Sequence, residues 1–140
     1  MKVLSFNFDR ISIERFSSSL NDLKISNKMD IKEIVEAQAD FLSTQDKVLG
    51  VRFFFSLDYS PDIAKIEING ATALAVSPET SKEVIERWRK KEIPQDFKTN
   101  LFNFLFRKVG LKALELEEEF GLPSHIPFPV FKKSEDSKKD

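Results

Sequence analysis

The chain contains no cysteine, and this absence excludes several kinds of chemistry at once. Without thiols there is no disulfide framework, no thiolate nucleophile and no cysteine-bound metal. There is only one histidine, His125, so neither a histidine metal site nor a serine–histidine triad can be assembled within one subunit in the usual way. Because a catalytic histidine normally needs an orienting partner, we expect His125 to be a structural or surface residue.

Glycine is also scarce, with four scattered residues in the whole chain. A loop that cradles phosphate needs clustered glycines, so no nucleotide-binding motif is expected. No other cofactor motif is present, and an enzyme would need a site that no local spacing reveals. The sequence therefore predicts a non-enzymatic protein without a cofactor or a metal ion.

Long apolar runs are missing as well. The longest, residues 53–55 and residues 101–106 with Asn103 among them, are far too short to cross a bilayer. The N-terminal residues lack an uninterrupted apolar segment and a small-residue cleavage site, so we expect a cytoplasmic protein. A net charge of −1, from 22 basic and 23 acidic residues, disfavours nucleic acid as a partner.

Phenylalanine is the abundant aromatic residue, with 14 Phe against one Tyr and one Trp. Phe offers apolar area without a hydrogen-bonding group, so it suits protein cores and apolar binding surfaces equally. Most of these residues should pack between a sheet and helices. Three are exceptions: Phe54 is out of phase on its strand, and Phe128 and Phe131 lie in an apolar tail that three prolines stiffen.

The first half of the chain alternates between apolar and polar residues with the period of a β-strand. Residues 3–16 change phase halfway, and a bulge near Asp9 and Arg10 would reconcile the two halves. Residues 47–59 are the clearest strand. Residues 63–76 follow it after a turn at 60–62, and Gly70 should mark a bend or bulge.

Residues 23–41 have two interpretations. Their apolar side chains fall on odd positions, including Met29, Ile31 and Val35, which is the period of a strand. A helix beginning at Asp30, with Glu33 completing a capping box, would also gather an apolar stripe. We favour the strand because the odd phase begins upstream of the proposed cap. Short turns between the four strands then predict an antiparallel meander.

Helices are expected after the strands. Thr80 and Glu83 suggest a capping box for a helix that ends near Lys91, with Val84, Ile85 and Trp88 as its apolar face. The cations near its end, Arg87, Arg89, Lys90 and Lys91, mostly indicate the solvated end of a helix, where positive charge suits the helix dipole.

A second helix should begin at Pro94 and be buried on most sides, because residues 97–109 are so rich in Phe and Leu. Gly110 should break or kink it, and Gly121 should cap the continuation over residues 111–120. The four glutamates of this continuation should lie largely in solvent; they are Glu115, Glu117, Glu118 and Glu119. Residues 1–131 form one expected domain, and residues 132–140 a disordered charged tail.

The order of four strands, helices and a proline-containing segment resembles the SecB export chaperones. Residues 101–107 and 122–131 are similar in style to the helix and the following strap of that family. The chain also looks like a group of archaeal proteins of unassigned activity, through Asp-Tyr-Ser-Pro at 58–61, Glu-Arg-Trp at 86–88 and the proline pattern at 122–129. The resemblance implies an α+β fold, a four-stranded antiparallel sheet followed by two to three helices, that assembles into dimers or tetramers.

The resemblance also implies a function. A SecB-like protein would hold unfolded or nascent polypeptides without ATP and take part in protein transport. Phe54, Phe128 and Phe131 would then line its polypeptide-binding grooves, with the proline-rich tail as a lid or a groove wall. The alternatives are an adaptor that binds one folded partner, such as a ribosomal or transcription assembly, through the patch Arg87, Arg89, Lys90 and Lys91, and a small-molecule site between sheet and helices.

Overall fold

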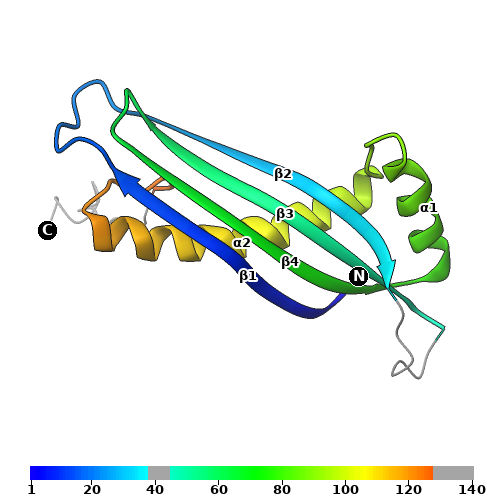
Figure 1. Cartoon of the computed structure of the whole chain (residues 1–140). Coiled ribbons are helices and arrows are strands. Elements are labelled where there is room, and N and C mark those ends of the chain that lie inside the picture. The colour runs from blue at the N-terminus through cyan, green and yellow to red at the C-terminus, as the bar shows by residue number, and fades with distance from the viewer. Residues whose placement is uncertain (38–44, 128–140) are drawn as a thin grey trace, which may run out of the picture.

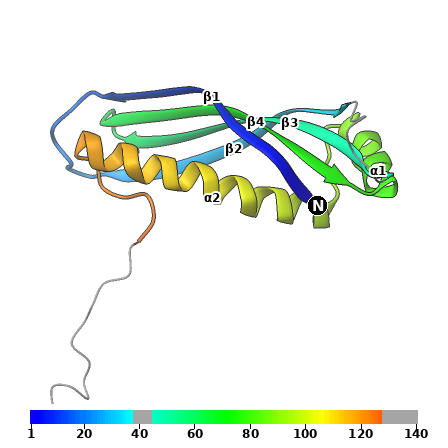
Figure 2. The ribbon, with the colours of Figure 1, turned by 90° about the horizontal axis from the view of Figure 1, so that it is seen from below.

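The computed structural model describes residues 1–37 and 45–127. Long helix α2 (Gln95–Phe120) runs along one face of a four-stranded sheet, and the short helix α1 (Pro78–Trp88) stands at one end of it (Figures 1 and 2). The strands are β1 (Lys2–Arg15), β2 (Lys24–Ala37), β3 (Lys47–Ser60) and β4 (Ala64–Val76). The predicted order of strands and then helices is confirmed.

The sheet is antiparallel throughout, as predicted, but its strand order is β1-β4-β3-β2. Strands β2, β3 and β4 form a meander, whereas β1 pairs with β4 and not with its sequence neighbour β2. The connection between β1 and β2 crosses the end of the sheet, where the backbone amides of Phe16 and Ser17 donate to the carbonyl of Ile63 at 2.8 and 3.3 Å. The two edges of the sheet are therefore β1 and β2.

A bulge in β1 lies where the change of phase predicted it. The register against β4 shifts between Phe8 and Arg10, opposite Gly70. A Cβ atom at Gly70 would lie 2.6 Å from the carbonyl oxygen of Asn7 and 2.6 Å from the ring of Phe53. Gly70 is therefore required for the close approach of two neighbouring strands rather than for an unusual backbone angle.

Residues 24–37 form a strand, so the alternative helix from Asp30 is wrong. The predicted strand also included residues 38–41, which lie outside the described residues. A bulge in β2, between Ile31 and Glu33, was not predicted. It reverses the phase of β2, so that Ile34 is buried and Val35 is 45% exposed.

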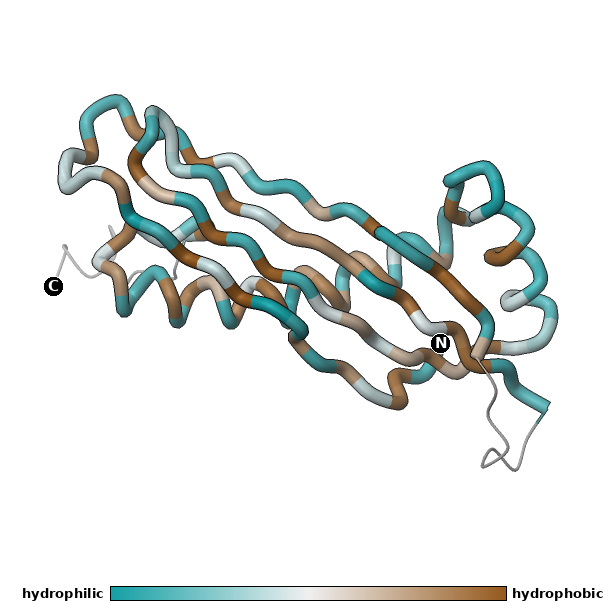
Figure 3. Tube along the Cα trace, in the orientation of Figure 1, coloured by the Kyte–Doolittle hydropathy of each residue, from teal (hydrophilic) through white to brown (hydrophobic). Residues whose placement is uncertain are grey.

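The core lies between the sheet and α2. The predicted inward face of β3 is confirmed, since Val51, Phe53, Phe55, Leu57 and Tyr59 are all buried. Figure 3 shows the resulting alternation of hydrophobic and hydrophilic residues along the strands. Burial of each large apolar side chain contributes roughly 1.5–3 kcal/mol, so this strand is central to the stability of the domain.

The sheet face opposite α2 carries ion pairs that cross the strands. Arg52 on β3 lies 3.3 Å from the carboxylate of Asp9 on β1 and 3.7 Å from that of Glu33 on β2. Arg10 on β1 likewise lies 3.6 Å from Glu67 on β4. Charges of both signs therefore keep this face hydrated without a covering element from the described part of the chain.

Helix α1 begins three residues before the predicted capping box. Ser77 is its N-cap, with Pro78 in the first turn, and the Ser77 side chain accepts a hydrogen bond from the amide of Thr80 at 3.2 Å. Ser77 is the N-cap instead of Thr80, because β4 ends immediately before it and proline is favoured at the first helical position. The helix ends at Trp88, so Arg87 lies in its last turn and the other predicted cations follow it.

Helix α2 is one continuous helix of 26 residues, so the predicted break at Gly110 is wrong. Gly110 is buried on the inner stripe, and this packing outweighs the cost of about 1 kcal/mol that glycine has in a helix. The expected burial of residues 97–109 on most sides is also wrong, because Phe106 is 39% exposed and the buried residues of this segment form a single stripe. Gly121, with φ of 65°, caps the helix as predicted.

Candidate functional site

A cleft of about 500 Å³ lies where the end of α1, the first turns of α2 and the edge strand β2 meet. In Figure 1, α1 stands at the end of the sheet where β2 finishes. Apolar and aromatic side chains make up half of its lining: Met29, Ile31, Trp88, Ile93 and Phe102. The other half is charged: Asp30, Arg87, Lys91, Glu92 and Lys98.

Two of the lysines are seated on aromatic rings of the cleft. The Lys91 ammonium lies 4.6 Å from the centre of the Trp88 ring, and the Lys98 ammonium lies 5.5 Å from the centre of the Phe102 ring. Such cation–π contacts are worth about 0.5–1 kcal/mol at exposed sites. They hold the two positive charges beside the apolar surface of the cleft.

The cleft also borders a free strand edge. In the described sheet, β2 pairs with β3 on one side and with no strand on the other. Met29 and Ile31, which line the cleft, belong to this edge and are only partly buried. An edge strand presents unpaired backbone donors and acceptors to which an extended polypeptide can add.

The cationic patch predicted from the sequence lies around the cleft and a neighbouring hollow. Arg87 and Lys91 line the cleft. Arg89 is the C-cap of α1, and Lys90 lines a neighbouring hollow together with Arg87, Glu83, Glu86 and Glu92. Arg87 therefore belongs to both hollows, and a partner-binding role for these four cations stays a prediction.

The predicted apolar binding residues are not brought to this cleft by the described chain. Phe54 is half-buried on β3, opposite Asp30 of β2 and Asn69 of β4, and the Lys32 ammonium lies 5.5 Å from the centre of its ring. Phe128 and Phe131 lie outside the described residues. A binding role for these three residues stays a prediction.

Sequence reasoning missed Lys98 and Phe102 as residues of a site. Their four-residue spacing places them on the same side of a helix, which was a usable signal. Trp88 was assigned only to the apolar face of α1, although it is the one tryptophan of the chain and also lines the cleft.

A buried polar cluster joins β3, α2 and the segment after Gly121. Glu117 is 1% exposed, so its expected place in solvent is wrong. One of its carboxylate oxygens accepts a hydrogen bond from the Tyr59 hydroxyl, and the other lies 3.0 Å from Nδ1 of His125. The run of glutamates suggested a solvated face, but Glu117 lies four residues after Ala113 and therefore falls on the buried inner stripe of α2. Its neighbours Glu118 and Glu119 are exposed.

This cluster gives His125 the orienting partner that the sequence did not reveal. The His125 side chain is 6% exposed and Leu122 is 7% exposed, so residues 122–125 are anchored against α2. Burial, the hydrogen bond to Glu117 and the negative charge of Glu117 raise the pKa of Tyr59 above its ordinary range. Tyr59 therefore stays protonated and donates to a carboxylate, an arrangement suited to holding the chain together.

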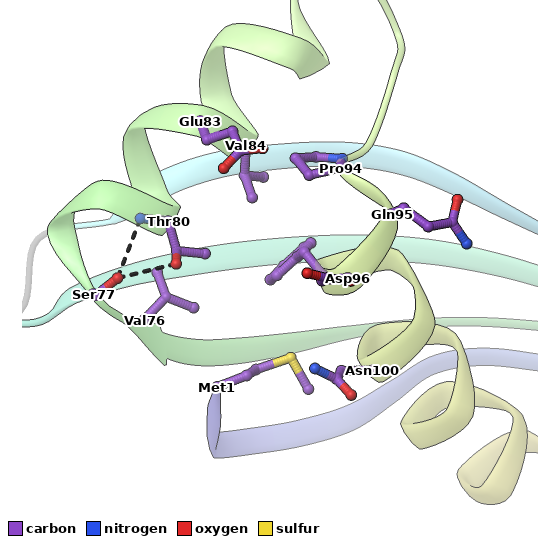
Figure 4. A pocket seen from close by; sticks show the side chains of 11 residues that line it. Met1, Val76, Ser77, Thr80, Glu83, Val84, Pro94, Gln95, Asp96 and Asn100 are labelled. Carbon is purple, nitrogen blue, oxygen red and sulfur yellow. Dashed lines mark hydrogen bonds between the residues drawn. The ribbon is translucent and has the colours of Figure 1, made fainter.

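A second cavity, of about 430 Å³, lies between the first turns of both helices, the end of β4 and Met1 (Figure 4). The hydroxyl groups in this cavity already take part in the N-terminal cap of α1. The Ser77 hydroxyl accepts a hydrogen bond from the Thr80 amide and donates one to the Thr80 hydroxyl. Its carboxylates, Glu83 and Asp96, lie on different helices. In the described chain, no group of three or more histidine or acidic residues is arranged to hold a metal ion.

None of the described helices is long and apolar enough to span a bilayer.

No family model and no curated protein matches the chain. Among solved structures, a SecB-like chaperone of Mycobacterium tuberculosis, determined in complex with a ChAD peptide from the HigA1 antitoxin, is similar in fold. The match has a TM-score of 0.58 and 12% sequence identity and covers 94% of this chain and 87% of the other. The chain therefore has a SecB-like fold, and its resemblance to a group of archaeal proteins stays a prediction.

Proposed function

We propose that this chain is a non-enzymatic, cytoplasmic protein-binding module that holds unfolded or nascent polypeptides without ATP. The observation that carries the proposal is the cleft, in which apolar side chains lie beside the unpaired edge of β2. An extended segment can hydrogen-bond to a strand edge while its side chains enter neighbouring pockets. Folded proteins rarely present such a segment, so the cleft suits unfolded clients.

The fold agrees with this proposal. The similar chaperone was solved with a peptide bound, and a fold that accommodates a peptide in one protein is a reasonable scaffold for the same task in another. The chemistry also agrees, because Trp88 and Phe102 offer large apolar area with few rotatable bonds.

An aggregation assay tests the proposal. Equimolar protein should delay the aggregation of a chemically unfolded client, and Phe102→Ala should weaken this protection several-fold because it removes apolar area from the cleft. Phe16→Ala is the matched control, since Phe16 is 55% exposed and does not line the cleft. Thermal melts of both variants establish that they fold. Equal protection by both variants, or no protection by the native chain, would refute the proposal.

The alternative proposal is an adaptor that binds one folded partner through its exposed cations. Arg89 and Lys90, which follow α1 and do not line the cleft, favour it because exposed charge commonly steers association between folded proteins. Affinity purification from the source organism separates the two. Many unrelated unfolded clients support the holdase, whereas one stoichiometric complex, lost in an Arg89→Glu/Lys90→Glu variant, supports the adaptor.

A further inference from the structure

We infer that the cleft selects extended segments that present both apolar and acidic side chains to the ends of helices α1 and α2. The inference rests on the proposed function, because it names the class of polypeptide that the same cleft would take. The inference is based on the positively charged side chains at the rim of the cleft, which lie beside the apolar side chains that line it.

Three rim cations have no carboxylate partner among the residues that the structure describes. Within the described chain, no ion pair joins Arg87, Lys91 or Lys98 to an acidic side chain. Two of them are held on aromatic rings, as described above, so their positions are set before any ligand binds. A carboxylate that enters the cleft can approach them without first breaking an existing ion pair.

The acidic residues of the rim do not cancel this charge. The Asp30 carboxylate lies 3.4 Å from the Lys28 ammonium and 3.9 Å from the Lys32 ammonium, so two lysines outside the cleft already neutralise it. Glu92 is then the one remaining acidic side chain in the lining, against three cations. The rim therefore has an excess of positive charge although the whole chain has a net charge of −1.

The edge of β2 determines the form of the ligand. A segment added to this edge is extended, and its side chains point alternately to opposite faces. The side chains that point toward the helices can then meet both the apolar surface of Trp88 and Phe102 and the cations beside these rings, while those between them point to the opposite face of the sheet. Uncharged segments lose the contacts with the cations, and basic segments are repelled by them.

Fluorescence of Trp88 provides a direct measurement, because the single tryptophan of the chain lines the cleft. The probes are three eight-residue peptides with serine at every second position and, between the serines, two leucines and two residues that are both glutamate, both glutamine or both lysine. Exposed ion pairs are each worth about two- to fivefold in affinity, so we expect the glutamate peptide to bind about tenfold more tightly than the glutamine peptide at low salt. This advantage should shrink as salt is raised, because exposed charges are screened.

The outcomes separate the inference from the proposed function. If none of the three peptides binds, the proposed function fails together with the inference. If all bind equally, or the lysine peptide binds most tightly, the cleft still binds polypeptide but the inference is overturned. A uridine oligonucleotide that competes as well as the glutamate peptide would also overturn it, by showing a general site for polyanions.

Two double variants test whether the cations of the cleft produce the preference for glutamate over glutamine. Arg87→Gln/Lys98→Gln should abolish the preference for glutamate over glutamine, because it removes two of the three cations at the rim of the cleft. Lys82→Gln/Lys112→Gln is the matched control, since it removes the same charge from side chains outside the cleft. Equal loss of preference in both double variants would overturn the inference in favour of diffuse attraction.

Discussion

At the scale of single residues, two buried glycines have different surroundings. A Cβ atom at Gly70 would meet the backbone of Asn7 and the ring of Phe53 at 2.6 Å, whereas one at Gly110 would meet only the His125 ring, at 3.8 Å. We predict that Gly70→Ala lowers the free energy of unfolding by about 2–3 kcal/mol, because neither neighbouring strand can move away. Urea denaturation measures this change.

Gly110→Ala is the comparison variant. Alanine should raise the free energy of unfolding by up to about 1 kcal/mol, because it is the better helix former and its Cβ atom makes an ordinary contact. Similar destabilisation by both variants would contradict the structural difference between the two sites.

The buried hydroxyl group of Tyr59 should make the stability of the domain depend on pH in the alkaline range. Its pKa is raised in the folded state by burial and by Glu117, so folding favours the protonated hydroxyl. The associated stability is complete below the unfolded pKa of about 10 and is lost as pH rises above it. We predict that the native chain loses stability above pH 10 with a slope steeper than that of Tyr59→Phe by up to about 1.4 kcal/mol per pH unit. Urea denaturation at pH 8 to 11 measures both slopes, and parallel slopes would contradict the prediction.

At the scale of elements, the side chain of His125 anchors the segment after α2. His125→Ala would leave one oxygen of the buried Glu117 carboxylate without its partner, which costs about 1–3 kcal/mol. We predict that this variant lowers the free energy of unfolding by that amount and speeds hydrogen exchange at the amide of Leu122, which bonds the Glu117 carbonyl at 2.9 Å. Ser124→Ala changes an exposed neighbour and should alter neither quantity. Unchanged exchange in His125→Ala would show that Leu122 alone holds the segment.

At the scale of the whole molecule, helix α2 carries unusual apolar exposure. Leu111 is 63% exposed, and Phe106 and Phe120 on the same helix are 39% and 38% exposed. We predict that these residues pack against a second copy of the chain, because exposed apolar residues on one element commonly mark an interface. Light scattering should then give a dimer or tetramer for the native chain and a smaller mass for Leu111→Glu. Ser26→Glu, which adds the same charge on β2, should keep the native mass; a monomeric native chain would contradict the prediction.

The sequence by itself determined the elements of this protein. Alternation predicted four strands, the change of phase located the β1 bulge near Asp9 and Arg10, and Gly121 marked the end of α2. Each of these features depends on residues that are close in the chain, where periodicity and backbone preference act directly. The same reasoning placed Arg87 and Lys91 near the end of a helix, which is why part of the cleft was visible beforehand.

Only the tertiary structure decided how those elements meet. It paired β1 with β4, buried Glu117 between Tyr59 and His125, and kept α2 intact through Gly110. It also brought β2 to the ends of two helices and so created the cleft. These outcomes depend on contacts between residues far apart in the chain, whose packing energies exceed local preferences of about 1 kcal/mol or less.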